Sequence, residues 1–178
     1  NKTEWAPGAD DDASGIAATL ESARILSKYN FSKTIMYCAW NAEERGLVGS
    51  SYFVNSIDPE EMKIDAMYQY DMIGYTSGEN IVNIHADSNS ASLLDHMVSV
   101  NNIYNNNLSI NSVYNSSLKA SDHSPFWKEG YKATLTIEKE FSPYYHTAND
   151  TLSHISSSML KSVTRLAIGS AAHSGKLI

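Results

Sequence analysis

Helix-like and strand-like segments alternate along the length of this chain, and this alternation limits the folds that it can adopt. Apolar residues recur at helical spacing over Ile16–Tyr29 and over Ser90–Tyr104. Short apolar runs rich in β-branched and aromatic residues, such as Thr34–Trp40 and Lys132–Lys139, predict buried strands between and after these helices. Helices interleaved with short buried strands favour a mostly parallel sheet that is covered by helices on both faces.

The predicted elements follow one another with no internal repeat and no linker long enough to divide the chain. Asp12 or Ser14 is expected to cap the first helix. The predicted helices are Ile16–Tyr29, Leu47–Ile57, Ser90–Tyr104 and Ser156–His173, and the predicted strands are Thr34–Trp40, Ile64–Met72, Asn80–Ala86, Ile110–Tyr114 and Lys132–Lys139. Because 178 residues is close to the usual size of one domain, residues 1–178 are expected to form a single α/β domain.

The composition excludes several classes of protein. The chain has 20 Asp and Glu residues against 13 Lys and Arg, which gives a net charge of −7. Binding of nucleic acid requires clustered positive charge, so no nucleic-acid partner is expected. No apolar run reaches the roughly 18 residues of a membrane-spanning helix, so no membrane span is predicted. Cys38 is the only cysteine, which excludes a disulfide within the chain.

Acidic and histidine side chains occur where the predicted strands end. Glu43 and Glu44 follow one strand, Asp71 closes the next, and His146 follows the last strand and its loop. Three aspartates, Asp10–Asp12, precede the first helix. Ligands of open α/β sheets gather at the carboxyl ends of the strands, so these side chains are expected to converge. Carboxylate and imidazole groups suit Zn²⁺, and a pair of hydrolytic metals needs a carboxylate that bridges them.

Each cluster taken alone also has a structural interpretation. Three aspartates before a helix can cap it and complement its dipole. Glu43 and Glu44, followed by an arginine, can form a solvated and self-paired loop. Asp71 is harder to explain in this way, because a charge at the end of an apolar strand is costly unless it is paired or coordinated. The combination of clusters favours a metal site, in which one adjacent glutamate is a ligand and the other accepts a proton.

Five segments in order along the chain carry a resemblance to a known family. They are APGADDDASG at 6–15, NAEERGLVGS at 41–50, YDMIGY at 70–75, SDHSPFWKEGY at 121–131 and YHTANDT at 145–151. They resemble the successive motifs of the di-zinc aminopeptidases of the bacterial leucyl aminopeptidase and aminopeptidase Y type. The resemblance implies a three-layer fold of the zinc exopeptidase type, with a mostly parallel mixed sheet and helices on both faces. It also implies removal of the N-terminal residue from a peptide substrate with a free N-terminus.

The resemblance implies a role for each matching residue. Asp11 would bridge two Zn²⁺ ions, with Glu44 and His146 as ligands of one ion and Asp71 as a ligand of the other. Glu43 would be the general base that activates the attacking water. The peptide bond that follows Asp11 is implied to be cis.

Further residues are expected to support the site or to bind the substrate. Asp122 and His123 are expected to support the ligands from behind them, and Asp150 either orients His146 or caps the following turn. An apolar pocket for the first side chain of the substrate is expected from residues that flank the ligand positions, which are Met72, Phe141 and Tyr145. The resemblance to the family also implies a preference for apolar N-terminal residues such as Leu.

Two departures from the family pattern bear on activity. The first metal ligand of the family is a His in a His-x-Asp motif before the PGADDD segment, and this chain starts after that point. We therefore expect the carboxyl-terminal two-thirds of an N-terminally truncated catalytic domain, with low activity alone. Two Zn²⁺ ions are expected in the complete domain and one or two in this chain, where His85 is the first candidate for a substitute ligand. A tyrosine that assists the oxyanion in relatives is replaced here by Leu118.

Two other functions stay open at this point. A glutaminyl-cyclase-type acyltransferase shares the fold and uses one zinc held by Asp, Glu and His, a set that Asp11, Glu44 and His146 would provide. A non-catalytic binding module of the same fold is the other alternative, although the presence of Glu43 and Asp71 argues against it. A secreted or periplasmic location is expected.

Overall fold

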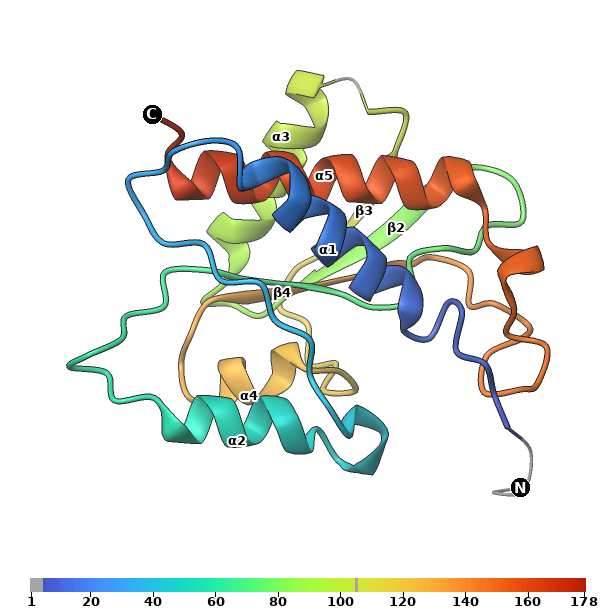
Figure 1. The fold of residues 1–178 in the computed structure, drawn as a ribbon, viewed down its shortest axis with the longest axis horizontal. Helices are drawn as coiled ribbons and strands as arrows, with labels where there is room; N and C mark the ends of the chain where they lie inside the picture. Colours follow the sequence, from blue (N-terminus) through green and yellow to red (C-terminus); the bar gives the residue numbers. More distant parts are fainter. Residues whose placement is uncertain (1–4, 105) are drawn as a thin grey trace.

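A computed structural model describes residues 5–104 and 106–178 as a sheet between two layers of helices (Figure 1). The helices are α1 (Ala13–Leu26), α2 (Val48–Ser56), α3 (Ala91–Tyr104), α4 (His123–Lys128) and α5 (Ser157–Gly175), with short 3-10 turns η1 (Glu43–Arg45) and η2 (Leu152–His154). The strands are β1 (Met67–Tyr70), β2 (Ile81–Ala86), β3 (Ser109–Val113) and β4 (Ala133–Glu138). None of the helices in this described part is both long and apolar enough to cross a membrane.

The four strands lie in the order β1-β4-β2-β3. β1 pairs with β4 in parallel, and β2 pairs with β3 in parallel. β2 and β4 run antiparallel, with Ile84 opposite Thr136. The sheet is therefore mixed and mostly parallel, which confirms the predicted fold class.

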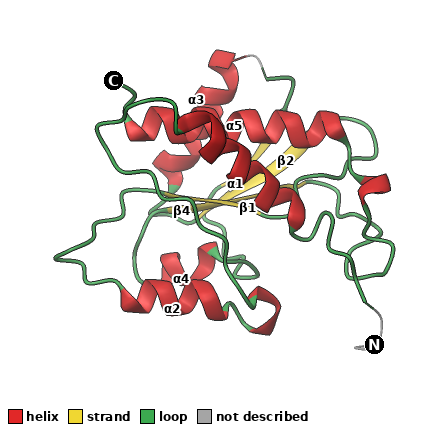
Figure 2. Cartoon of the chain, viewed as in Figure 1, coloured by secondary structure: helices red, strands yellow, loops and turns green. Residues whose placement is uncertain are grey.

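Both faces of the sheet are covered, as Figure 2 shows. α1, α3 and α5 form the layer on one face, over a large core that includes Ile84, Leu94 and Val163. α2 and α4 form the layer on the other face, where Val54 and Phe126 pack with Ala133 of β4. Burial of such side chains contributes roughly 1.5–3 kcal/mol each, so the two cores hold the sheet between its helices.

Most predicted elements occur within a few residues of their expected positions. Asp12, and not Ser14, caps α1, because its Oδ1 accepts a hydrogen bond from the Gly15 N–H at 3.0 Å. Gly15 has no room for a side chain, since an added Cβ would lie 2.1 Å from the carbonyl oxygen of Tyr70. This close approach brings the start of α1 against the carboxyl end of β1.

The prediction of a buried strand at Thr34–Trp40 is wrong. The segment carries no regular secondary structure, and Met36 and Tyr37 are 54% and 36% exposed. Within residues 5–104 and 106–178, no hydrogen bond involves its backbone N–H or C=O groups. Strand propensity needs a neighbouring strand to become a ladder of hydrogen bonds, and no described strand lies beside this segment.

Candidate active site

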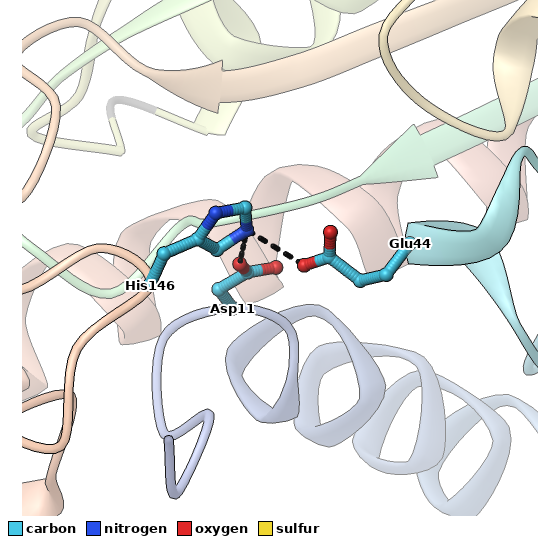
Figure 3. A group of neighbouring side chains, drawn as sticks. All are labelled: Asp11, Glu44 and His146. Carbon is cyan, nitrogen blue, oxygen red and sulfur yellow. Dashed lines mark hydrogen bonds and ion pairs between the residues drawn. The ribbon is translucent and has the colours of Figure 1, made fainter. Parts of the chain in front are cut away.

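Asp11, Glu44 and His146 converge beyond the carboxyl end of β1 (Figure 3). The His146 Nε2 lies 2.7 Å from Glu44 Oε1 and 3.2 Å from Asp11 Oδ2, and one ligand atom from each residue falls within 4.8 Å of the others. The side chain of Asp11 is only 16% exposed, whereas those of His146 and Glu44 are 48% and 59% exposed. Two carboxylates and one imidazole at such distances form a set that suits Zn²⁺ and leaves a position open to solvent.

Unusual backbone conformations occur at or beside all three residues of the cluster. The peptide bond between Asp11 and Asp12 is cis, as predicted. His146 itself has a φ of 57°, and Glu44 lies in a turn between Ala42 and Leu47, which both have a φ of 58°. Residues other than glycine rarely adopt such φ values, and residues with positive φ values cluster at functional sites.

The three aspartates of the PGADDD segment have different partners. Asp10 is buried, and its Oδ1 accepts a hydrogen bond from the Gly74 N–H at 2.7 Å. Asp11 points towards His146 and Glu44. Asp12 caps α1 and so turns away from the cluster. The alternative interpretation, in which the aspartates only cap the helix, therefore applies to Asp12 alone.

Asp150 supports the loop that carries Asp11. Its carboxylate accepts hydrogen bonds from the N–H groups of Asp10 at 2.9 Å and Asp11 at 3.1 Å, and it is 2% exposed. The two roles left open by the sequence were orientation of His146 and capping of the next turn. The hydrogen bonds of the Asp150 carboxylate correspond to neither of them.

Asp71 and Asp122 lie behind the cluster, and each is held by a serine. Ser121 Oγ donates a hydrogen bond to Asp71 Oδ2 at 2.6 Å, and Ser50 Oγ donates to Asp122 Oδ1. All four residues are buried. The sequence analysis missed Ser50 and Ser121, although both lie inside the quoted motifs, because the residues that each serine bonds are distant in the sequence.

Glu138 is a second residue that the sequence analysis missed. It is fully buried at the end of β4 and accepts hydrogen bonds from the N–H groups of Tyr75 at 3.1 Å and Ser142 at 2.7 Å. Burial, followed by the charge and hydrogen bond of Asp10, raises the pKa of Glu138 to about 9. The carboxyl group of Glu138 faces that of Asp10, and this contact joins the Asp10–Asp12 loop to the segment that leads to His146.

Negative charge accumulates at the site. Burial raises the pKa of Asp11 to about 7, and the carboxylates of Asp71 and Glu44 add to the shift. Burial also raises the pKa of Glu43 to about 7, with further contributions from Asp71, Glu44 and Asp122. Crowded carboxylates resist ionisation in this way unless a cation compensates them. The donor set and its uncompensated charge therefore fit a divalent metal ion.

Neither His123 nor His85 joins the cluster. His123 is fully buried, its Nε2–H donates to the Leu118 carbonyl at 2.8 Å, and its ring lies edge-on to Trp127. Burial lowers the pKa of His123 to about 4, so it is neutral near neutral pH. His85 lies on β2 and bonds Ser116 at 3.0 Å. The only group of possible metal ligands in the described residues does not include His85, so the structure does not support it as a substitute ligand.

The three residues expected to line an apolar pocket differ in exposure. Met72 is 3% exposed and packs against Leu135 and Ile137, so it offers little surface to a ligand. Phe141 and Tyr145 are 55% and 38% exposed and pack edge to face. The Tyr145 ring also stacks on that of His146, with the ring centroids 3.7 Å apart. Two aromatic side chains thus border the cluster on its solvent side.

A sheet with carboxylates and a histidine beyond its strand ends is typical of a metal-dependent hydrolase. A model of the family described as Peptidase family M28 matches residues 2–171, and the chain belongs to this family. Aminopeptidase YwaD of Bacillus subtilis is 29% identical over 163 residues, which cover 88% of this chain and 35% of that protein. The structure of BSAP, a zinc aminopeptidase from Bacillus subtilis, matches with a TM-score of 0.85 and 27% identity, covering 95% of this chain and 42% of that one.

The comparisons also bear on the acyltransferase alternative. A glutaminyl cyclase from Porphyromonas gingivalis matches with a TM-score of 0.71 and 22% identity, covering 97% of this chain and 65% of that one. This similarity shows a shared fold alone. The chain spans less than half the length of YwaD and of the BSAP chain in its solved structure.

Proposed function

We propose that this chain is part of a zinc-dependent aminopeptidase that removes apolar residues from the N-terminus of peptides, and that residues 1–178 belong to one catalytic domain. The observation that carries the proposal is the convergence of Asp11, Glu44 and His146, with one ligand atom of each within 4.8 Å of the others. The family membership and the aminopeptidase relatives support the same activity.

Asp11, Glu44 and His146 would hold one Zn²⁺, since their ligand atoms converge. Asp71, together with Asp11, would hold a second ion, as the resemblance to the di-zinc aminopeptidases implies. Asp150 and Ser121 fix the two aspartates through hydrogen bonds. When bound, Zn²⁺ would supply a Lewis acid that polarises the scissile carbonyl group and makes water a stronger nucleophile.

Glu43 is the proposed general base. Burial is the largest cause of its raised pKa, and a raised pKa is favourable for a group that must both accept and release a proton. Glu43 takes the proton of the attacking water and delivers it to the nitrogen of the leaving peptide. Its carboxylate neighbours also attract the free α-amino group of the substrate, which selects for the end of a chain.

Phe141 and Tyr145 are proposed to contact the first side chain of the substrate. Both are exposed aromatic side chains beside His146, and Tyr145 is held there by stacking on the imidazole. Aromatic rings next to a polar site favour an apolar group on the substrate. Leucine and phenylalanine amides are therefore the first substrates to compare.

A secreted or periplasmic location is also part of the proposal, as is the absence of a nucleic-acid partner, which the net charge of −7 supports. Fractionation of the source cells with an antibody against the chain tests the location. Recovery of the chain in the cytoplasmic fraction alone would contradict it.

The test of the function combines zinc content with hydrolysis of leucine p-nitroanilide. We expect bound zinc in the chain, and we expect Glu43→Gln to keep the zinc while the rate falls by about 10²–10⁴-fold. Glu129→Gln, at an exposed position of α4's carboxyl end, is the matched control and should change neither quantity. Zinc binding without any hydrolysis by the chain or by the full-length protein would contradict the proposal.

The glutaminyl-cyclase-type reaction is the second candidate, because Asp11, Glu44 and His146 form a complete set of three ligands for a single zinc ion. Cyclisation of peptides with an N-terminal glutamine, followed by mass spectrometry, separates the two reactions. Loss of ammonia from the glutaminyl peptide, without hydrolysis of leucine amides, would favour this second candidate.

A further inference from the structure

Three buried acidic residues adjoin the candidate active site without being proposed ligands. They are Asp10, Glu138 and Asp150, and their exposed fractions are 2%, 0% and 2%. Among the described residues, no lysine, arginine or histidine forms an ion pair with any of them. Burying a carboxyl group is costly, and hydrogen bonds are the usual compensation. The hydrogen bonds of these three residues therefore indicate what each of them does.

Glu138 holds two separate segments through its carboxyl group. Its Oε2 accepts a hydrogen bond from the Tyr75 N–H at 3.1 Å, and its Oε1 accepts one from the Ser142 N–H at 2.7 Å. Tyr75 follows Asp71 in the turn after β1, and Ser142 lies in the loop between β4 and His146. Each oxygen of this one side chain therefore fixes a segment that carries a proposed ligand.

Asp10 brings a third segment to the same place, because its carboxyl group faces that of Glu138. The Oδ1 of Asp10 accepts a hydrogen bond from the Gly74 N–H at 2.7 Å, one residue before the amide that Glu138 binds. Asp11, the proposed bridging ligand, follows directly in the sequence. The two facing carboxyl groups thus join the Asp11 loop to the turn after Asp71.

Asp150 connects the far end of the His146 loop to Asp10 and Asp11. Its two carboxylate oxygens accept hydrogen bonds from the N–H groups of both residues. The loop that starts after Glu138 and ends at Asp150 is therefore attached near Asp10 at both ends. The backbone hydrogen bonds of residues 143–149 reach no further than three positions along the chain. The two attachments, and not the interior of the loop, therefore set where His146 lies relative to Asp11.

Glu44 is the member of the cluster that this network does not hold. The η1 turn that carries it forms its backbone hydrogen bonds within residues 41–49. Removal of the Glu138 carboxyl group is therefore expected to loosen the segments of Asp71 and His146 while η1 stays in place.

We propose that Glu138 is a positioning residue of the zinc site, which fixes the segments of Asp11, Asp71 and His146 relative to one another. The inference deepens the proposed function and rests on it, because it takes these three residues as metal ligands. Groups that orient a ligand from outside the coordination sphere typically raise metal affinity by about 10–100-fold. Glu138 acts in this way through backbone amides and through Asp10, and it does not touch the metal itself.

The first measurement is zinc affinity, by competition with a chromogenic chelator. Glu138→Ala should lower the affinity by about 10–100-fold, because the three segments lose their common anchor. Glu138→Gln has the same length, keeps an oxygen that accepts one of the two N–H groups and gains an N–H that can donate to Asp10, so it should recover most of the affinity. Glu138→Asp is one methylene shorter and cannot reach both amides, so it should lose part of the affinity, even where the alanine variant does not fold.

The second measurement is hydrogen exchange in the absence of zinc, which does not depend on the proposed function. In Glu138→Ala, the amides of Tyr75 and Ser142 should lose their protection, since each loses the carboxylate oxygen that accepts its N–H. The amides of residues 46–49 should exchange as they do in the unaltered chain, because their acceptors lie within 41–49.

Asn101→Ala is the matched control. Like Glu138, Asn101 is a buried polar side chain that holds a loop, since its Nδ2 donates a hydrogen bond to the Leu108 carbonyl at 2.8 Å. That loop carries no proposed ligand, so the variant should bind zinc as tightly as the unaltered chain does.

Kinetics with zinc at saturation separate positioning from general loss of stability. Glu138→Ala should raise the KM for leucine p-nitroanilide more than it lowers kcat, because Phe141 and Tyr145 lie on the loosened loop whereas Glu43 lies on η1. Asn101→Ala should change neither quantity.

Two results would overturn the positioning role. One is a zinc affinity in Glu138→Ala and Glu138→Asp equal to that of the unaltered chain. The other is an equal loss of affinity in Asn101→Ala, which would mean that any loosened loop weakens the site. Zinc binding without hydrolysis would contradict the proposed function alone, whereas these two results would contradict the role of Glu138 alone.

Discussion

The two sides of Asp11 differ in how their charges are satisfied. On the His146 side, Glu44 and the imidazole approach Asp11 from solvent, and three ligand atoms already converge. On the Asp71 side, the carboxylates are buried and are held by the hydroxyl groups of Ser121 and Ser50. No described histidine, lysine or arginine forms an ion pair with Asp71 or Asp122.

The two halves of the site therefore differ in what compensates their charge. The His146 side brings three possible metal-ligand atoms together. On the Asp71 side, burial raises the pKa of Asp71, and the Asp122 and Glu44 charges add to that shift. Such a buried group is stable as a charge only with a further cationic or metal partner.

The largest expected effect comes from removal of the histidine. His146→Ala deletes the one nitrogen ligand of the three, and we expect zinc affinity to fall by at least about 100-fold, since changes to groups that merely support a ligand already cost 10–100-fold. Isothermal titration with zinc chloride measures the zinc affinity of the variant. His85→Ala is the control and should bind zinc as the unaltered chain does. Equal losses in both variants would reject the assignment of the site to the His146 side.

Bound zinc should also raise the free energy of unfolding of the chain. A ligand that binds only the folded state adds about 2.7 kcal/mol to the free energy of unfolding at 100 times its Kd. Denaturant titrations with and without zinc measure this gain, and a chelator should reverse it. The gain should disappear in Glu44→Ala, whereas a gain of the same size in that variant would mean that zinc binds elsewhere.

Ser121→Ala tests the Asp71 side. It removes the hydroxyl that donates to Asp71 Oδ2 and leaves a buried carboxylate without that partner. We expect the free energy of unfolding to fall by about 1–3 kcal/mol. Ser56→Ala, which removes an exposed hydroxyl bonded to a backbone carbonyl, is the comparison and should cost less. An unchanged stability in Ser121→Ala would show that Asp71 is neutral or otherwise satisfied.

Measured per pH unit, the smallest expected effect is a change in the pH dependence of stability through Glu138. Its pKa is raised to about 9 in the folded chain from an ordinary value of 4.5. The folded state therefore binds the extra proton, and this contribution to stability is complete below about pH 4.5 and is lost as the pH rises towards 9. The loss has a slope of at most about 1.4 kcal/mol per pH unit.

Glu138→Gln cannot ionise and should flatten the decline between pH 5 and 9. Asp10, the carboxylate that Glu138 faces, also has a raised pKa and will retain part of the slope. Denaturant titrations at several pH values measure the slope, with the exposed Glu79→Gln as the control. A slope identical to that of the unaltered chain would mean that Glu138 is ionised throughout the range.

Local sequence patterns predicted those helices and strands that pack in a regular way. The periodicity of α1, α3 and α5 and the apolar runs of β2 and β4 locate them within a few residues. α4 was missed because a helix of six residues is too short to show a period. The strand predicted at Thr34–Trp40 was wrong because the composition of the segment is typical of a strand, but a strand forms only beside another strand.

The motifs likewise identified the side chains that converge in the cluster but not the groups that hold them. Asp11, Glu44 and His146 occur in quoted motifs and lie together. The contact between Ser121 and Asp71 joins residues 50 positions apart, and the contact between Asp10 and Glu138 joins the first loop to the end of β4. No local pattern encodes which partners such groups find.

Local patterns in the sequence were enough to predict the α/β class, the order of the helices and most of the strands, and the candidate metal ligands. These follow from periodicity and residue chemistry, which act over a few neighbouring positions. The tertiary structure was needed to show that Asp150 holds the Asp11 loop, that His123 turns away from the site, and that Thr34–Trp40 faces an open groove. Each of these depends on which distant segment lies alongside, because hydrogen bonds and burial are satisfied across the fold.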